Sequence, residues 1–283
     1  NKLNVYASLQ SLNQETLEII KRKNIPKELY AKLQLDLQNS GKMSTAEFII
    51  PMPAETKISF LNGMKEIILM GVEHLNVYTT MMLKGTEMAS KEWRDKYGME
   101  TKWRMLPRQI GEYCGEKVIE VEEVCVATNT MSFSEYLECR GFTLITTIYS
   151  SEQFDVIKMI LNDLKINRYD FFSEIWGQVK SGASELSALY NSFIKETREE
   201  LWDSKEELRA FIKKTKNYEK FISGELGDNL IRKYRTLALL YKSIPAFELA
   251  YKSIRNLGQD KVTLEVGEYL DAIKIWVEAL RNI

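Results

Sequence analysis

Cysteine and histidine, the residues that most often bind metals or act as nucleophiles, are few and widely spaced in this chain. Cys114, Cys125 and Cys139 lie 11 and 14 residues apart, a spacing that matches neither a zinc site nor a redox CxxC pair. His74 is the only histidine, which argues against a Ser-His-Asp or Cys-His mechanism. The sequence therefore predicts no metal site of its own, and its sparse, odd cysteine count is typical of a reducing cytoplasm.

Two other side chains could take part in chemistry. Glu47 stands between Ala46 and Phe48 in an apolar run that predicts a strand, and a carboxylate buried in a strand is costly without a partner. We therefore expect Glu47 either to form an internal ion pair or to bind a ligand. Cys139 stands in a charged neighbourhood, but a buried, inert thiol is the better interpretation of it.

The composition excludes several classes of protein. The 283-residue chain has 39 Lys and Arg against 40 Asp and Glu, for a formal net charge of -1, so it lacks the basic excess that draws proteins to nucleic acid. With 45% hydrophobic residues, 14 glycines and 5 prolines, the composition is that of a globular protein. We expect no nucleic-acid partner and no membrane span, because no apolar run approaches the roughly 20 residues that a bilayer requires.

The first ninety residues predict parallel βαβ units. Strands are expected at residues 5–9, 45–50 and 75–82. One helix should be capped by Ser11 or Asn13, and a second should begin after Thr56 and end at Gly71. Because the carboxyl ends of parallel strands meet at one edge of a sheet, a ligand is expected at that edge.

The rest of the chain divides into two further parts. Residues 91–115, rich in Arg, Lys, Trp and Tyr, are interpreted as an irregular crossing segment. A strand over 118–128 and a helix capped by Ser132 or Ser134 should follow. From about residue 152 onward nearly every window has helical periodicity. The sequence therefore predicts an α/β fold of three parts, the last of them helical, at residues 1–90, 91–150 and 151–283.

Three motifs follow one another along the first part. They are Ser8-Leu-Gln-Ser-Leu-Asn13 with Lys21-Arg22 after it, Ile50-Pro-Met-Pro-Ala-Glu-Thr56, and Asn76-Val-Tyr-Thr-Thr with Leu83-Lys-Gly-Thr-Glu87. In this order they resemble the fourth, fifth and sixth strands of a radical S-adenosylmethionine (SAM) enzyme barrel, particularly in members that also bind cobalamin. Ala54 stands where the family's Pro-Gly-Glu-Thr turn has glycine. The resemblance covers about residues 1–145 and implies half of a parallel β/α barrel followed by a helical C-terminal domain.

The resemblance also implies a SAM site across the carboxyl ends of the strands. Ser8 and Gln10 would contact the ribose or methionyl part of SAM, and Arg22 would bind the methionine carboxylate. Glu47 would accept hydrogen bonds from the ribose hydroxyls, and Thr79 would offer backbone groups to the adenine. Each residue also has an ordinary interpretation: a surface ion pair for Arg22, for example, and core packing for Thr79. No residue is assigned a catalytic role.

One departure from the family concerns its four-iron four-sulfur cluster. The family holds that cluster through CxxxCxxC after the first barrel strand, and this sequence contains neither the motif nor the first three strands. The resemblance therefore implies the C-terminal part of a longer enzyme, with the cluster held upstream. Its substrate would be an unidentified small molecule, which the cobalamin-dependent members of the family methylate. The strand near Val5 would be an open edge, which the upstream half of the polypeptide or a partner should cover.

A second interpretation belongs to a different class of protein. The chain would be a non-catalytic scaffold that keeps a degenerate half barrel and uses its helical domain for protein contacts. A cluster loop in the same polypeptide distinguishes the two interpretations, because the enzyme requires it and the scaffold does not.

Overall fold

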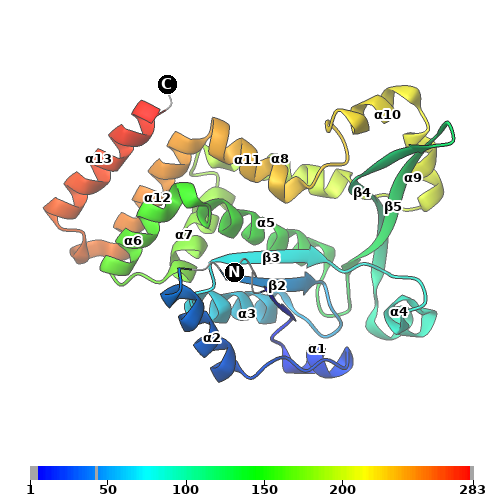
Figure 1. Ribbon diagram of the computed structural model, residues 1–283, viewed down its shortest axis with the longest axis horizontal. Helices are drawn as coiled ribbons and strands as arrows, with labels where there is room; N and C mark the ends of the chain where they lie inside the picture. The colour runs from blue at the N-terminus through cyan, green and yellow to red at the C-terminus, as the bar shows by residue number, and fades with distance from the viewer. Residues whose placement is uncertain (1–5, 42–43, 281–283) are drawn as a thin grey trace.

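Three parallel strands form a sheet from the first part of the chain. The structure is a computed structural model that describes residues 6–41 and 44–280. Its strands are ordered β1 (Tyr6–Gln10), β2 (Thr45–Ile50), β3 (His74–Thr79) (Figure 1). Two helices, α1 (Gln14–Ile19) and α2 (Lys27–Asn39), join β1 to β2, and α3 (Lys57–Leu69) joins β2 to β3. The expected parallel α/β arrangement is confirmed, although the third strand ends at Thr79 and Val5 lies outside the described residues.

One face of this sheet is buried and the other is polar. Phe48 and Val77 are Cα partners across β2 and β3, and both belong to the main hydrophobic core together with Leu9 of β1. Successive side chains of a strand point to opposite faces, and at the intervening positions Glu47 is half-buried and Asn76 is exposed. The helices therefore pack against one face, and the described residues cover the other, the open face, only in part.

The helices begin at residues whose side chains cap them. Asn13 accepts hydrogen bonds from the backbone N–H groups of Glu15 and Thr16 at the start of α1. Thr56 and Ser59 form a reciprocal capping box at the start of α3. Gly71, with a φ of +87°, takes the left-handed conformation after that helix. The caps predicted at Asn13 and Thr56 are confirmed.

The crossing segment is not irregular, so that expectation was wrong. It contains helix α4 (Lys91–Tyr97) and strand β4 (Glu100–Tyr113), which pairs antiparallel with β5 (Glu116–Ala127). Cys114 and Gly115 form the two-residue turn, with φ values of +53° and +81° that suit a type I′ hairpin. The strand was missed because charged residues interrupt its apolar ones and because its one buried side chain, Met105, is covered by helices about a hundred residues further along the chain.

Helix α2 was also missed by the sequence analysis. Its buried side chains, Tyr30, Gln34 and Leu37, follow one another at helical spacing, but one of the three is polar. The apolar stripe is therefore too narrow to stand out in the sequence.

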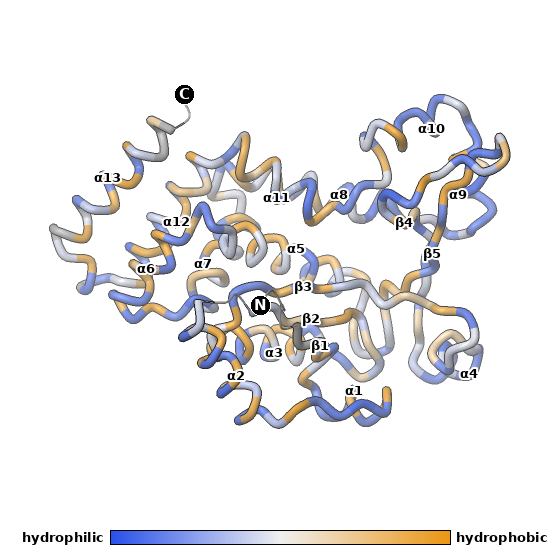
Figure 2. Tube along the Cα trace, viewed as in Figure 1, coloured by the Kyte–Doolittle hydropathy of each residue, from blue (hydrophilic) through white to orange (hydrophobic). Residues whose placement is uncertain are grey.

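The second half of the chain is helical, as predicted, and it begins with α5 (Phe133–Tyr149), which Ser132 and Glu135 cap in a second capping box. The helices that follow are α6 (Asp155–Asp163), α7 (Arg168–Lys180), α8 (Leu186–Glu199), α9 (Lys205–Ile212), α10 (Thr215–Ile222), α11 (Leu230–Tyr241), α12 (Ser243–Gly258) and α13 (Leu264–Leu280). Hydrophilic and hydrophobic residues alternate along them, as in amphipathic helices (Figure 2). Among the described residues, no helix has the length and hydrophobicity that crossing a bilayer would require.

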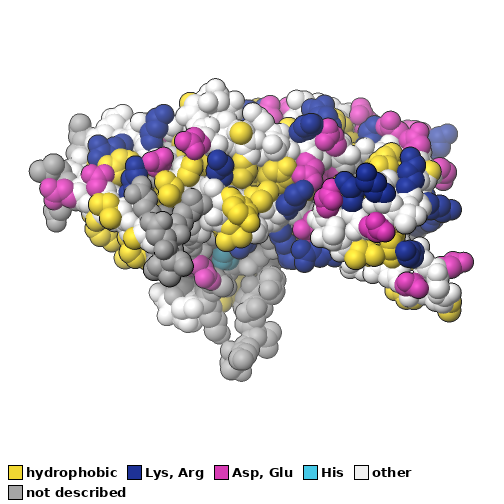
Figure 3. Space-filling view, turned by 90° about the horizontal axis from the view of Figure 1, so that it is seen from above, with side chains coloured by type: hydrophobic (Ala, Val, Ile, Leu, Met, Phe, Trp, Pro, Cys, Tyr) yellow, Lys and Arg dark blue, Asp and Glu magenta, His cyan; other side chains and the backbone are white. Residues whose placement is uncertain are grey.

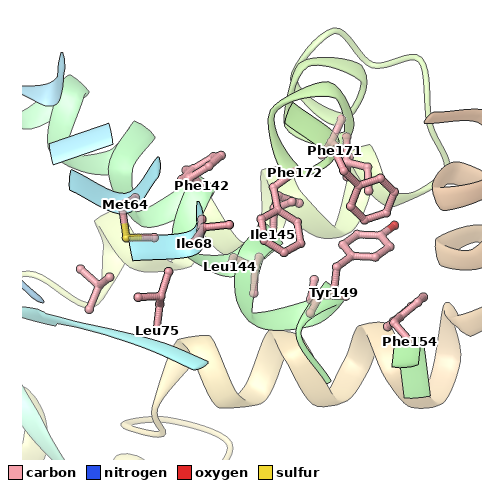
Figure 4. Packing of buried hydrophobic residues seen from close by; sticks show 14 of the residues in the cluster. Met64, Ile68, Leu75, Phe142, Leu144, Ile145, Tyr149, Phe154, Phe171 and Phe172 are labelled. Carbon is pink, nitrogen blue, oxygen red and sulfur yellow. The ribbon is translucent and has the colours of Figure 1, made fainter. Parts of the chain in front are cut away.

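Helix α5 lies at the centre of the main core. Its residues Phe142 and Ile145 lie near α3, and Tyr149 packs against aromatic rings from other elements (Figure 4). The Tyr149 ring centroid lies 4.7 Å from that of Phe154 and 5.7 Å from that of Phe171, and its hydroxyl donates a 2.9 Å hydrogen bond to the Ala246 carbonyl. One helix thus joins the sheet to the helical half.

The hairpin has a smaller core of its own. Met105 of β4 packs with Leu208 and Ile212 of α9 and with Phe221 of α10. In Figure 1 the hairpin and these two helices project together at one end of the molecule, and α13 lies at the other.

Candidate functional site

The loops at the carboxyl ends of β1 and β2 are joined by a buried carboxylate. Ser11 and Ser59 each donate a short hydrogen bond to one oxygen of Glu55, which is only 2% exposed. Burial raises the pKa of Glu55, although both serine hydroxyls act to lower it. The segment from Pro51 to Thr56 thus forms a turn before α3, and Glu55 holds that turn to the end of β1.

Three threonines fix the same loops through backbone carbonyls. Thr16 donates to the Pro53 carbonyl at 2.9 Å, and Thr80 donates to the Pro51 carbonyl at 2.6 Å. Thr130, which precedes α5, donates to the Glu55 carbonyl at 2.9 Å. The ends of all three strands are therefore held to one another by neutral donors before any ligand binds.

A row of polar side chains crosses the open face of the sheet. Ser8, Glu47 and Asn76 are Cα partners on β1, β2 and β3, so their side chains lie on the same face. The Tyr78 hydroxyl donates to Glu47 across 3.4 Å, which is long for a hydrogen bond. We call Ser8, Glu47 and Asn76 the polar row. The Glu47 carboxylate can accept more hydrogen bonds than the one from Tyr78.

The position of Glu47 differs from the expectation. The sequence predicted a carboxylate buried in a strand, but the side chain is half-buried on the open face. Its neighbours Ala46 and Phe48 are buried on the other face. An apolar run indicates a strand, yet it does not say which of the two faces the helices leave open.

Gln10 and Arg22 lie next to the polar row. The β1–β2 register shifts between Ser8 and Gln10, and Gln10 has a φ of +61°, unusual for a residue other than glycine. Arg22 donates a short hydrogen bond to the Ser8 carbonyl, and its Nε donates to the Asn24 side chain at 3.2 Å. The structure thus places Ser8 and Glu47 together on the open face, with Gln10 and Arg22 at the end of β1, where Arg22 is bound to neutral oxygens.

The Thr79 side chain is not part of that group. It is 4% exposed and lies on the buried face, where its hydroxyl is 2.8 Å from the hydroxyl of Tyr136. The neighbouring Thr80 uses its N–H for the Ile50 carbonyl and its own carbonyl for the N–H of Cys125, both at 2.9 Å. The Thr79 side chain is therefore packed in the core, which is the second of the two interpretations that the sequence allowed.

The three cysteines differ in burial. Cys125 and Cys139 are buried, and burial raises the pKa of both, to about 12 for Cys125. Cys114 is exposed at the hairpin turn. Within residues 6–41 and 44–280, no group of three His, Cys, Asp or Glu side chains has a geometry that could hold a metal ion.

The sequence analysis missed a cavity between the hairpin and the helices. Its volume is about 400 Å³, and its apolar lining includes Met105, Trp202 and Phe211. Glu196 and Glu200 of α8 and the loop after it supply carboxylates to the same cavity. No local sequence signal could have indicated it, because the lining comes from three separate segments.

Comparisons with known proteins point to one group of enzymes, although no protein-family model matches the chain. Over 139 residues the chain is 32% identical to the 2-(S-pantetheinyl)-carbapenam-3-carboxylate methyltransferase of Streptantibioticus cattleyicolor. Over 138 residues it is 31% identical to the cobalamin-dependent radical SAM methyltransferase TokK of Streptomyces tokunonensis.

Each match covers 48% of this chain and 20% of the relative. The chain is therefore similar, over about half of its length, to cobalamin-dependent radical SAM methyltransferases. It spans only about a fifth of the length of these relatives.

Proposed function

We propose that this chain is part of a cobalamin-dependent radical SAM methyltransferase and supplies half of its parallel β/α barrel together with the helical region that follows. The observation that carries the proposal is the polar row on the open face of the parallel sheet, which would become the inner face of the proposed barrel. The similarity to two methyltransferases supports the same assignment. The parts proposed are the half barrel at 1–90, the connecting segment at 91–150 and the helical domain at 151–283.

The polar row and its neighbours would hold SAM. Glu47 has free acceptor capacity for ribose hydroxyls, and Ser8 beside it is exposed. Gln10 follows the bulge and would contact the methionyl or ribose part. Arg22 would either turn from the Ser8 carbonyl to the methionine carboxylate or keep that strand end in place. Thr79 would contribute only backbone groups, because its side chain is bound to Tyr136.

The four-iron four-sulfur cluster does not fit the described residues. Three thiolates must converge on it, but two of the cysteines are buried in separate elements and the third is at the hairpin turn. The cluster would be held by another part of a longer protein, and that part would also cover the free edge of β1. When bound, SAM and the cluster would supply a radical that abstracts hydrogen, and cobalamin would carry the methyl group.

The residues of this chain have positioning roles in that scheme. The Glu55 turn fixes the strand ends so that the polar row keeps its spacing, and α5 holds the sheet against the helices. A small-molecule substrate would approach the open face, with the helical half on one side of it. Seclusion from water protects radical intermediates from side reactions, and the helical half would supply part of that seclusion.

The first test is the coding sequence upstream of Asn1, over the ~200 residues that the rest of such a barrel would require. We expect a CxxxCxxC motif there. The longer protein, with its cluster reconstituted and a one-electron reductant such as dithionite added, should then cleave SAM reductively and release 5′-deoxyadenosine and methionine. Glu47→Gln should weaken SAM binding, whereas Glu92→Gln, at an exposed position of α4, should not. A reading frame without a cysteine triad would overturn the proposal.

A scaffold with a degenerate half barrel is the second candidate function. It is favoured by the large apolar side chains that α13 exposes at the C-terminal end, Tyr269, Ile275 and Trp276. If the upstream sequence lacks the cysteine triad, these exposed side chains become the first place to look for a protein partner.

A further inference from the structure

A second cavity runs along the free edge of β3. Its volume is about 240 Å³, and it lies between that strand, α5 and the beginning of α11. The residues that matter here are Asn76 of β3, Arg140, Thr143 and Thr147 of α5, and Arg232 and Arg235 of α11. We call it the arginine cavity. Basic side chains also gather towards the middle and right of the face seen in Figure 3.

Arg140 is a buried cation whose donors are not fully used. It is 6% exposed, and its Nε has no hydrogen-bond partner among the described residues. Its guanidinium carbon lies 6.0 Å from the centroid of the Phe193 ring. A buried charge without full hydrogen bonding is costly, and a cost of this kind at the wall of a cavity indicates that an anionic group belongs there.

The nearby carboxylates compensate Arg140 only in part, because each also interacts with another arginine. Glu200 also faces Arg104, whose guanidinium nitrogen lies 3.6 Å from it. Burial raises the pKa of Glu200, although both Arg104 and Arg140 act to lower it. Asp228 already pairs with Arg108 at 3.0 Å. Each carboxylate in the lining thus has another arginine to neutralise.

Helix α11 adds positive charge to the same cavity. Its first turn lines the wall, and the side chain of Asn229 accepts the Arg232 N–H at 3.1 Å. The N-terminal end of a helix carries partial positive charge and attracts anions. Arg232 and Arg235 have exposed side chains, and no ion pair of either is found within the described ranges. Two exposed guanidinium groups and one buried one therefore line a single cavity.

We propose that the arginine cavity binds an oxyanion, the carboxylate or phosphate group of the substrate. The assignment of this anion to a substrate rests on the function proposed above, whereas the binding of an anion does not. Asn76 belongs to both the cavity lining and the polar row. An anionic group held at the arginines would therefore place the rest of the molecule beside the open face, where SAM is proposed to bind.

The test uses the 283-residue chain with inorganic phosphate and, separately, acetate. Binding is followed by calorimetry and by the NMR signal of His74, the only histidine, which lines an adjoining cavity together with Arg235. We expect saturable binding of at least one anion. Tighter binding of phosphate would indicate a phosphorylated group, and tighter binding of acetate would indicate a carboxylate.

The matched variants locate the site. Arg232→Gln with Arg235→Gln should weaken anion binding by about tenfold or more, and both positions are exposed, so folding should be unchanged. Arg209→Gln, at an exposed position of α9, should bind as the unmodified chain does. Arg140→Gln should also weaken binding, and its circular dichroism spectrum shows whether it folds.

Two results would overturn the proposal: no saturable binding of either anion, or binding that the double variant leaves unchanged. The proposed function can fail independently. If no cysteine triad is encoded upstream but the double variant still weakens binding, the cavity remains an anion site and only its assignment to a methyltransferase substrate is lost.

Discussion

The strand ends of the parallel sheet and the β4–β5 hairpin hold polar groups in place by different means. Around the sheet, the contacts are mostly neutral hydrogen bonds converging on one buried carboxylate, Glu55. In the hairpin they are ion pairs: Arg94 with Glu123, Arg104 with Glu122, and Arg108 with Asp228. Both arrangements adjoin a proposed binding surface, the polar row in one case and the arginine cavity in the other.

Because the sheet uses neutral hydrogen bonds and the hairpin uses ion pairs, the two regions should respond differently to the loss of one side chain. When one partner of a neutral hydrogen bond is removed, the cost is that of leaving one buried polar group without a partner. A buried ion pair leaves an uncompensated charge instead, which costs more than the pair itself contributes. We therefore expect the hairpin to be more sensitive than the sheet to the loss of one side chain, and the predictions below test that comparison from the largest expected effect to the smallest.

The largest effect is expected at Arg104, whose side chain is 14% exposed and whose Nε lies 2.7 Å from Glu122. Burial alone would lower the pKa of Arg104, but Glu200 and Glu122 together raise it above its ordinary value. Arg104→Met leaves Glu122 without its guanidinium partner and leaves Arg140 as the arginine beside Glu200, and it should lower the free energy of unfolding by about 3–5 kcal/mol. Chemical denaturation measures this change.

The control for Arg104 is Arg209→Met on the exposed side of α9, which should change stability by no more than about 0.5 kcal/mol. Adding Glu122→Gln and Glu200→Gln to Arg104→Met should restore part of the loss, because the unpaired charges are then removed. A loss no larger than that of the control would mean that the hairpin does not depend on its ion pairs.

A smaller effect is expected at Glu55. Glu55→Ala leaves the hydroxyls of Ser11 and Ser59 without their acceptor and should cost about 2–3 kcal/mol. Glu55→Gln should cost less, because an amide can accept from one serine and donate to the other, and because burial already disfavours the charged carboxylate. Thermal and chemical denaturation of both variants measure the difference.

Glu92→Ala, at an exposed position of α4, is the matched control for Glu55. Equal losses for Glu55→Gln and Glu55→Ala would contradict the description of the turn as a neutral network, since they would show that the negative charge itself is required. In that case the sheet and the hairpin would depend on charge in the same way.

The parts of the fold that the sequence predicted have local causes. The caps at Asn13 and Thr56 need only side chains a few residues from the backbone groups that they bind. The strand at Thr45–Ile50 alternates in burial, and its last three residues, Phe48, Ile49 and Ile50, are aromatic or β-branched residues that favour strands. Strand β4 has no such pattern, because Trp103 and Met105 are covered by helices far along the chain.

The candidate site was predictable in part for the same reason. The positions of Ser8 and Glu47 follow from the order of the strands, whereas the side of the sheet left open depends on where α3 and α5 pack. The direction of Thr79 depends on Tyr136, a contact across 57 residues. Arg140 and Arg235 line one cavity only because α5 and α11 pack together, so no spacing in the sequence could have predicted the arginine cavity.

The smallest effect is expected at His74, where the sheet meets charges from the helical half. His74 begins β3 and is half-buried. Burial lowers the pKa of His74 below its ordinary 6.5, and Lys158, Arg168 and Arg235 lower it further against the opposing Glu73. The folded protein therefore favours the neutral imidazole, and below pH 6.5 the unfolded chain binds more protons than the folded one.

The contribution of His74 to stability is therefore complete above pH 6.5 and is lost as the pH falls below that value towards the folded pKa. Between pH 7.5 and 5.5, the melting temperature of the unmodified chain should fall more than that of His74→Gln. An NMR titration should place the pKa of His74 below 6.5 and show that Lys158→Gln, which also frees Asp155 from its 2.6 Å ion pair, raises it. Lys205→Gln on α9 should leave it unchanged. A pKa of His74 at or above 6.5 would mean that the positive charges of α6, α7 and α11 do not act on the sheet. The stability of the sheet would then depend even less on charge than the neutral donors around Glu55 indicate.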